Sequence, residues 1–301
     1  MNNGNQILTA QNSESNIDKL LAQRKIYSNA KVLQNLLLFT TVLVPISISI
    51  ITNFTRFRID GKSWIFISYS IVVLLVEKII ERVIDRNKKT AASIQEEFDI
   101  GVLDIPDNET LNTVFVDLET IRANSKREKK SKKKVAKVTN WYSTKIEILN
   151  TDIAVLFCQR MNICYDFSIK RKYSFYLVMI SVLTFLCLLI FSLSQNFSLQ
   201  KFIVEVVLPS LPIFTFTYKE VSTNLEALDN LGKLKEIIES ELLAKSLSDS
   251  VEKEKVRKIQ DRIFSNRMLS PLIPDFIYRA LWTKLEDEMN YSVENRINEL
   301  K

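Results

Sequence analysis

The chain of 301 residues contains no histidine, and it has only four glycines and three cysteines. Without histidine it lacks the most usual general base and the commonest metal ligand. The glycines are too few and too scattered to build a phosphate-binding loop: Gly4, Gly61, Gly101 and Gly232. The cysteines form neither an even set nor a zinc-site spacing: Cys158, Cys164 and Cys187. We therefore expect a reducing compartment, no metal or cofactor, and no enzymatic activity.

Four long apolar stretches are present instead. Residues 32–55 and 173–200 contain no charged side chain, and about 20 such residues in a helix cross the apolar core of a bilayer. Residues 63–84 and 202–218 are weaker candidates, because the first ends in charged residues and the second contains Glu205, Pro209 and Pro212. The connections 56–62 and 195–201 are short enough to turn each helix back. We predict two transmembrane hairpins, 32–84 and 173–218.

Basic residues near the ends of these stretches predict their orientation. They gather on the side away from the hairpin tips: Arg24, Lys25, Lys31, Arg82, Arg86, Lys88, Lys89, Lys170, Arg171, Lys172 and Lys219. The tips hold fewer: Arg56, Arg58, Lys62 and Lys201. Because basic residues favour the cytosolic side, we predict that segments 1–31, 85–172 and 219–301, with both termini, lie in the cytosol.

The cytosolic segments have helical spacing of apolar residues, so we predict an all-α membrane protein with a helical cytosolic domain. One helix runs from residue 12 into the first span, and another ends at Pro106. We expect Asp107 or Asn108 to cap the next helix. The repeat from Ile146 to Phe157 leads into the third span. Beyond the fourth, a stripe from Leu225 to Leu242 and a helix over residues 251–264 complete the domain.

Residues 126–137 contain eight basic side chains and one acid, Glu128. This run accounts for the net charge of +6 of the whole chain. It either attracts an anionic ligand or lipid surface, or is a solvated, flexible segment that reports its side of the membrane. No aromatic residues interleave with the lysines, so we expect no direct binding of DNA or RNA.

Several short motifs follow one another around the hairpins. They are Gln95-Glu96-Glu97-Phe98-Asp99, Asn140-Trp141-Tyr142, Cys158-Gln159-Arg160 with Asn162 and Asp166, Arg262, Arg267, Pro271-Leu272-Ile273-Pro274-Asp275-Phe276 and Glu286-Asp287-Glu288-Met289-Asn290. In this order the set resembles the SMODS-associated four-transmembrane effector family of bacterial CBASS anti-phage systems. The resemblance covers nearly the full length, and the element from Cys158 to Asp166 is its most specific part.

The resemblance implies a cell-killing effector of the bacterial inner membrane. Such proteins are encoded beside a nucleotidyltransferase that makes a cyclic di- or trinucleotide during infection. The effector is expected to sense that messenger through its cytosolic region, to form a homo-oligomer and to permeabilise the lipid bilayer, which causes abortive infection.

A cyclic oligonucleotide offers phosphates to arginines, and bases to aromatic faces and amide edges. We predict that Arg160 and Arg171 bind phosphate and that Trp141 and Tyr142 stack on bases. Three further side chains would read base edges: Gln159, Asn162 and Asp166. The alternative is that these polar groups form a satisfied structural network that ties the middle region to the C-terminal helices.

The conduction path is predicted separately. Thr41, Ser49 and Thr52 lie along one face of the first span and either line water or contact a neighbouring helix. Glu77 and Glu81 share a face at the cytosolic end of the second span, where they would form a ring in an oligomer or reach the interface. Two prolines, Pro209 and Pro212, provide a hinge in the fourth. Two alternatives stay open: a non-conducting scaffold that recruits a cytosolic partner, and a small-ion channel.

Overall fold

A computed structural model describes residues 4–44, 47, 63–111, 113–246 and 249–300. Every regular element among them is helical, which confirms the all-α prediction. In chain order they are α1 (Asn5–Gln11), α2 (Glu14–Leu38), the π-helix η1 (Phe39–Leu43), α4 (Ser63–Leu103), α5 (Leu118–Lys129), α6 (Lys132–Ala136), the 3-10 helix η2 (Thr144–Ile148), α7 (Thr151–Ser194), α8 (Leu199–Phe202), the π-helix η3 (Ile203–Val207), α9 (Leu208–Leu243), α10 (Lys253–Leu269) and α11 (Asp275–Glu299).

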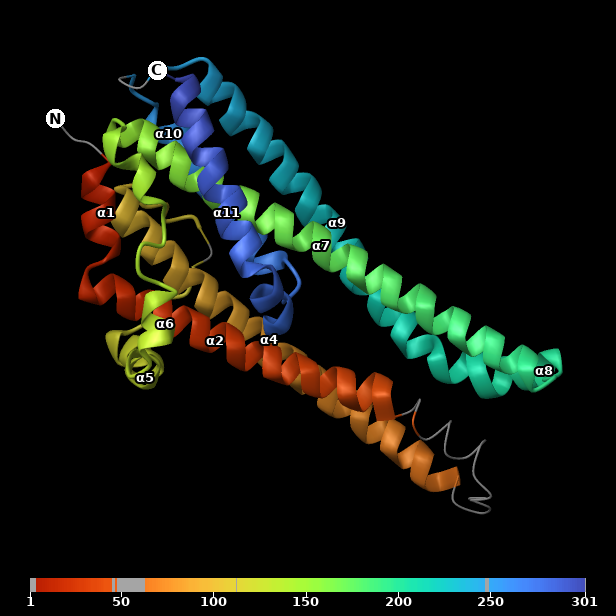
Figure 1. Ribbon diagram of the computed structural model, residues 1–301. Coiled ribbons are helices and arrows are strands. Elements are labelled where there is room, and N and C mark those ends of the chain that lie inside the picture. Colours follow the sequence, from red (N-terminus) through yellow and green to blue (C-terminus); the bar gives the residue numbers. More distant parts are fainter. Residues whose placement is uncertain (1–3, 45–46, 48–62, 112, 247–248, 301) are drawn as a thin grey trace.

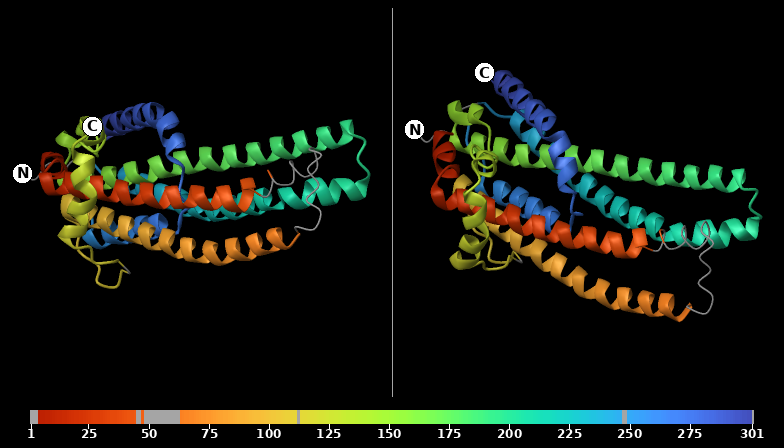
Figure 2. Two further views of the ribbon diagram at one scale, coloured as in Figure 1. Left: turned by 90° about the horizontal axis from the view of Figure 1, so that it is seen from below. Right: turned by 60° about the horizontal axis from the view of Figure 1, so that its bottom comes forward.

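Two helical hairpins extend in the same direction from one helical head (Figures 1 and 2). The first pairs α2, which η1 continues, with α4, and the second pairs α7 with α9, which η3 precedes. The head contains α1, α5, α6, η2, α10 and α11 with the adjoining ends of the four long helices. Both described chain ends lie in the head, so each hairpin leaves it and returns to it.

The hairpin helices are longer than the apolar stretches that predicted them. α4 has 41 residues and α7 has 44, which corresponds to about 60 Å or more at 1.5 Å per residue. Each therefore continues from its apolar stretch into the head without a break. Within the described residues, α7 is the one helix that is long and apolar enough to cross a membrane. The tip of the first hairpin lies outside the described residues.

Large apolar side chains cover the outside of both hairpins. Leu75 on α4 and Ile190 on α7 are each 66% exposed, and their neighbours along both helices are exposed as well. Contiguous apolar patches of this kind mark a membrane or a protein partner. The hairpins thus present the surface that a bilayer requires.

The head has its own hydrophobic core, centred on the first turns of α7. Ile153, Leu156 and Phe157 are fully buried there among residues of α1, α4, α9, α10 and α11. The backbone before α1 closes one side: Gly4 donates its N–H to the Leu149 carbonyl at 2.8 Å. A Cβ at Gly4 would lie 2.0 Å from the Ile146 carbonyl oxygen, so only glycine permits this approach.

Three helix predictions need correction. The described residues between Pro106 and Leu118 are not helical. Helix α5 begins at Leu118 with Asp117 as its N-cap, whose Oδ1 accepts from the Thr120 N–H at 2.6 Å. Asn108 instead binds Asp261 of α10 at 2.8 Å, so a tertiary contact replaced the expected cap. Leu225 lies on α9, but its side chain is exposed rather than part of the buried stripe. Helix α11 was not predicted.

The basic run is folded and partly neutralised. It forms the end of α5 and the whole of α6. Lys129 binds Glu14 at 2.6 Å and Asp18 at 3.2 Å, both on α2, and Lys134 binds Glu128 at 2.7 Å. This part of the chain is therefore helical and ion-paired, and its proposed attraction to an anionic ligand or lipid surface stays a prediction.

Candidate functional site

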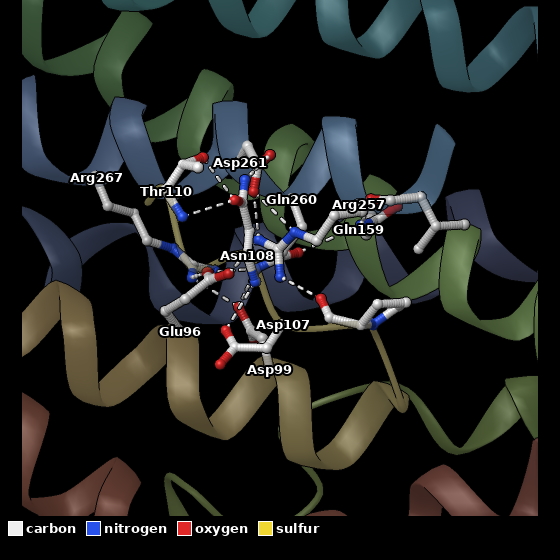
Figure 3. A network of polar contacts seen from close by, with 12 residues as sticks. Glu96, Asp99, Asp107, Asn108, Thr110, Gln159, Arg257, Gln260, Asp261 and Arg267 are labelled. Atoms are coloured by element: carbon white, nitrogen blue, oxygen red, sulfur yellow. Dashed lines mark hydrogen bonds and ion pairs between the residues drawn. The ribbon is translucent and has the colours of Figure 1, made fainter. Parts of the chain in front are cut away.

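A network of charged side chains lies inside the head, between α4 and α10 (Figure 3). Glu96 and Asp99 stand three residues apart on one face of α4 and are almost fully buried. Arg257 of α10 reaches Glu96 at 2.5 Å, and Arg267 of the same helix reaches Asp99 at 2.6 Å. The amide of Gln260 donates to both acids, at 2.8 and 3.1 Å.

The pKa values of this network reflect the competition between burial and charge pairing. Burial raises the pKa of Glu96, and nearby Asp99 raises it further, while the two arginines act in the opposite direction. Burial alone would lower the pKa of Arg267, but Asp99 and Glu96 outweigh it and raise that pKa above its ordinary value. Each charge therefore depends on its partner, because an unpaired ion in this environment is costly.

Three of the predicted ligand-binding residues extend this network. The Tyr142 hydroxyl donates to Asp99 at 2.6 Å and accepts from the Asn162 amide at 3.1 Å. The Gln159 amide donates to the Val256 carbonyl at 2.9 Å. Tyr142 and Gln159 are buried. A base or phosphate would have to displace these partners, so the contacts fit the structural alternative, and the ligand-binding roles stay predictions.

The remaining predicted ligand residues do not gather into one site. Trp141 packs edge-on against Phe98, at 6.5 Å between ring centroids. Arg160 donates to Glu239 at 2.7 Å and to Ser292 at 2.9 Å, which links α7 to α9 and α11. Asp166 pairs with Lys170 on the same helix at 3.0 Å, and Arg171 is exposed: the two lie towards the second hairpin.

The sequence motifs did not predict the centre of the network, which consists of Glu96, Asp99, Arg257, Gln260 and Arg267. A usable signal was present, because the two acids are three residues apart and the three α10 side chains repeat at helical spacing. No group of three or more potential metal ligands exists in the described part of the chain. Cys158 lies beside the network, but burial raises the pKa of its thiol well above the ordinary value, which disfavours the reactive thiolate.

The predicted conduction residues have local partners where they are described. The Thr41 hydroxyl donates to the Leu37 carbonyl one turn earlier, at 2.7 Å. Ser49 and Thr52 lie outside the described residues. Glu81 pairs with Lys78 at 2.8 Å and with Lys219 of α9 at 3.1 Å, which joins the two hairpins, and Glu77 is half-buried. Their pore-lining roles stay predictions.

The predicted hinge in the fourth stretch coincides with an irregular helix. The π-helix η3 ends at Val207, Pro209 follows at the start of α9, and Pro212 lies inside that helix. Proline has no N–H to donate to the carbonyl four residues earlier, so the regular α-helical bonding is interrupted here. Movement at this point stays a prediction.

The turn between α10 and α11, residues 270–274, contacts both hairpins near the head (Figures 1 and 2). Leu272 packs with Ala30 of α2 and Ile84 of α4. Its neighbour Ile273 packs instead with Ile169 and Tyr173 of α7. Two consecutive side chains of one backbone segment thus pack against different hairpins, Leu272 against the first and Ile273 against the second. We call this segment the 270–274 turn.

Comparisons with known proteins give a consistent result. A family model described as the SMODS-associating 4TM effector domain matches residues 5–296. That description is of an effector domain and not of a catalytic family. A protein of Bacillus cereus (strain VD146), named a probable CBASS effector molecule, is 30% identical over 295 residues, covering 94% of this chain and 95% of the relative. No solved structure gives a significant match.

Proposed function

Because this chain belongs to the SMODS-associating 4TM effector family, we propose that it permeabilises the inner membrane of a bacterium in response to a cyclic oligonucleotide made during phage infection. Family membership supports the role of anti-phage effector. The messenger, the membrane lesion and the assembly are the parts that we propose.

The observation that carries this proposal is the joining of both hairpins to the head by the 270–274 turn. The hairpins expose the apolar surface that a bilayer accepts, whereas the head has a separate core with a buried charge network. A change in the head that shifts α10 or α11 would move Leu272 and Ile273 together. Both hairpins would then respond to one event in the cytosolic part.

Permeabilisation requires several copies of the chain. Helices of one protomer enclose too little polar surface for an aqueous path, and the described outer faces of the hairpins are apolar. We propose that the ion pairs of Glu81 with Lys78 and Lys219 face neighbouring copies in that oligomer. Breaking them in favour of contacts between copies would place charged groups around a common axis. The basic residues at the head ends of the hairpins support a cytosolic head.

Dye-loaded liposomes that contain the purified protein test the proposal. A panel of cyclic di- and trinucleotides should include one that releases the dye, while linear dinucleotides of the same bases should not. Crosslinking in the same vesicles should show higher oligomers only with the active compound. Vesicles that stay intact with every cyclic compound, while one of them binds the protein, would replace the pore by a non-conducting scaffold.

A further inference from the structure

Four basic side chains lie together where α2 and the end of α6 meet α11. Arg24 comes from α2, Lys133 from α6, Lys137 from the residue after α6, and Arg279 from the second turn of α11. Burial lowers the pKa of Lys137, and the charges of Arg24, Lys133 and Arg279 lower it further, so each of these three cations lies within electrostatic range of Lys137. Segments far apart in sequence thus contribute to one cationic cluster.

These cations lack the partners that neutralise the rest of the basic run. Lys129 and Lys134 of the same run bind carboxylates. Among the described residues, by contrast, no carboxylate lies within ion-pair distance of any of the four. The Arg24 guanidinium contacts only the Lys137 carbonyl, at 3.4 Å. The Arg279 Nε contacts only the Asp275 carbonyl, also at 3.4 Å. The cluster therefore holds positive charge that no ion pair among the described residues neutralises, although the Asp275 carboxylate attracts Arg24 and Lys137 from farther away.

The acids near the cluster either already have a cationic partner or are partly buried. Asp275 binds Lys31 at 2.6 Å, and Asp166 binds Lys170 at 3.0 Å. Glu286 is half-buried, and burial raises its pKa. None of these acids forms an ion pair with Arg24 or Lys137.

Two aromatic side chains adjoin the cations. The Lys137 ammonium lies over the ring of Trp282, at 5.7 Å from the centroid. Trp282 meets Tyr165 of α7 edge to face, at 6.5 Å between centroids. The Tyr165 hydroxyl is buried and has no hydrogen-bond partner among the described residues. Because a buried hydroxyl usually finds a partner, this atom is a further sign of an unfilled polar contact beside the cations.

We infer that Arg24, Lys133, Lys137 and Arg279, together with Trp282 and Tyr165, form a binding site for the phosphates and one base of a nucleotide. The chemistry is that of nucleotide recognition: guanidinium and ammonium groups bind phosphate oxygens, and an indole face stacks on a base. The site contains none of the residues predicted from the motifs, although Tyr165 lies next to Asp166 on α7. This inference rests on the proposed function, which supplies the cyclic oligonucleotide as the ligand.

The position of the site explains how a ligand would act on the hairpins. Arg279 and Trp282 lie in the first turns of α11, directly after the 270–274 turn. Arg24 and Lys137 come from other segments, namely α2 and the residue after α6. A phosphate bound by Arg279 together with Arg24 and Lys137 would hold the start of α11 against α2 and α6. The resulting displacement of α11 would be transmitted to Leu272 and Ile273.

Binding of each cyclic di- and trinucleotide to the full chain in detergent, with a linear dinucleotide as reference, tests the site. Lys137→Glu and Arg279→Glu should each weaken binding of the active compound about tenfold or more, because each replaces a charge-assisted contact by repulsion. Lys132→Glu is the matched control. It makes the same charge change in the same run, but Lys132 lines a separate open hollow of about 630 Å³. It should change affinity less than threefold.

The outcomes separate this site from the proposed function. Equal weakening by Lys137→Glu and Lys132→Glu, at unchanged melting temperatures, would overturn the site, since net charge alone would then explain binding. Leakage that still needs the compound at wild-type concentration in both site variants would also overturn it. Loss of binding in these variants would support the site even if no compound causes leakage, and only the proposed function would fail. Binding that depends on Lys137 to phosphatidylglycerol vesicles, but to no nucleotide, would overturn the nucleotide as ligand.

Discussion

Replacing Arg267 by methionine is expected to destabilise the head strongly. The Arg267 guanidinium lies 2.6 Å from Asp99 and 3.9 Å from Glu96, and both carboxylates are almost fully buried. Methionine fills a similar volume but leaves the charge of Asp99 without its ion-pair partner. Breaking a buried pair in this way costs about 3–5 kcal/mol, which should lower the melting temperature by at least about 5 °C.

Arg262→Met is the matched control for that change. Arg262 lies on the same helix and is partly buried, but its guanidinium donates to a neutral acceptor, the Asn230 side-chain oxygen, at 2.7 and 3.2 Å. Its loss should cost about 1 kcal/mol. The measurement is thermal unfolding of the detergent-solubilised variants, followed by far-ultraviolet circular dichroism.

The double variant Asp99→Asn with Arg267→Met separates charge from packing. It removes both partners, so it should be more stable than Arg267→Met alone, because no unpaired carboxylate remains at position 99. The reasoning would be refuted if Arg267→Met cost no more than Arg262→Met, or if the double variant lost the sum of the two single effects.

Three further changes test other parts of the structure. Leu272→Ala should cost about 2–4 kcal/mol and raise dye leakage without any nucleotide, whereas Leu269→Ala, whose side chain is exposed, should do neither. Burial alone would raise the pKa of Glu239, but its two arginine partners outweigh burial and lower it. The stability that Glu239 contributes is therefore present above about pH 4.5 and lost as the pH falls below it, and Glu239→Gln should flatten that loss in acid melting curves. Gly4→Ala should lower the melting temperature, because its Cβ would meet a backbone carbonyl, whereas Gly101→Ala, an exposed helical position with open space, should raise it by the equivalent of about 0.5–1 kcal/mol. An unchanged melting temperature for Gly4→Ala would contradict the close approach.

The helical hairpins were predictable from sequence because long runs of uncharged apolar residues are typical of membrane-spanning helices. The helix before the first span and the helix before Ser270 were predictable from apolar spacing, and the structure confirms both as α2 and α10. The number of membrane crossings stays a prediction. The N-cap before α5 was misplaced because Asp107, Asn108 and Asp117 are all good caps in sequence, and only the contact of Asn108 with α10 decides among them.

Helical spacing indicates which charged residues of the buried network share a helix face, but not which distant face they meet, because a charged residue is expected on the surface unless its partner is known. Glu96 and Arg257 are 161 positions apart, and nothing local connects them. The same holds for Trp282, which lies in a helix that apolar spacing did not reveal. Local patterns therefore predicted the elements, whereas the contacts between distant segments decided which polar residues meet.

The continuity of α4 has a mechanical consequence. The network holds α4 at Glu96 and Asp99, close to the last residue of this helix. More than thirty residues of α4 precede these contacts and extend away from the head. At about 1.5 Å per residue, they form a lever roughly 45 Å or more in length. A tilt of five degrees at the end held by the network would carry the far end by about 4 Å, so a small rearrangement in the head becomes a larger displacement at the opposite end.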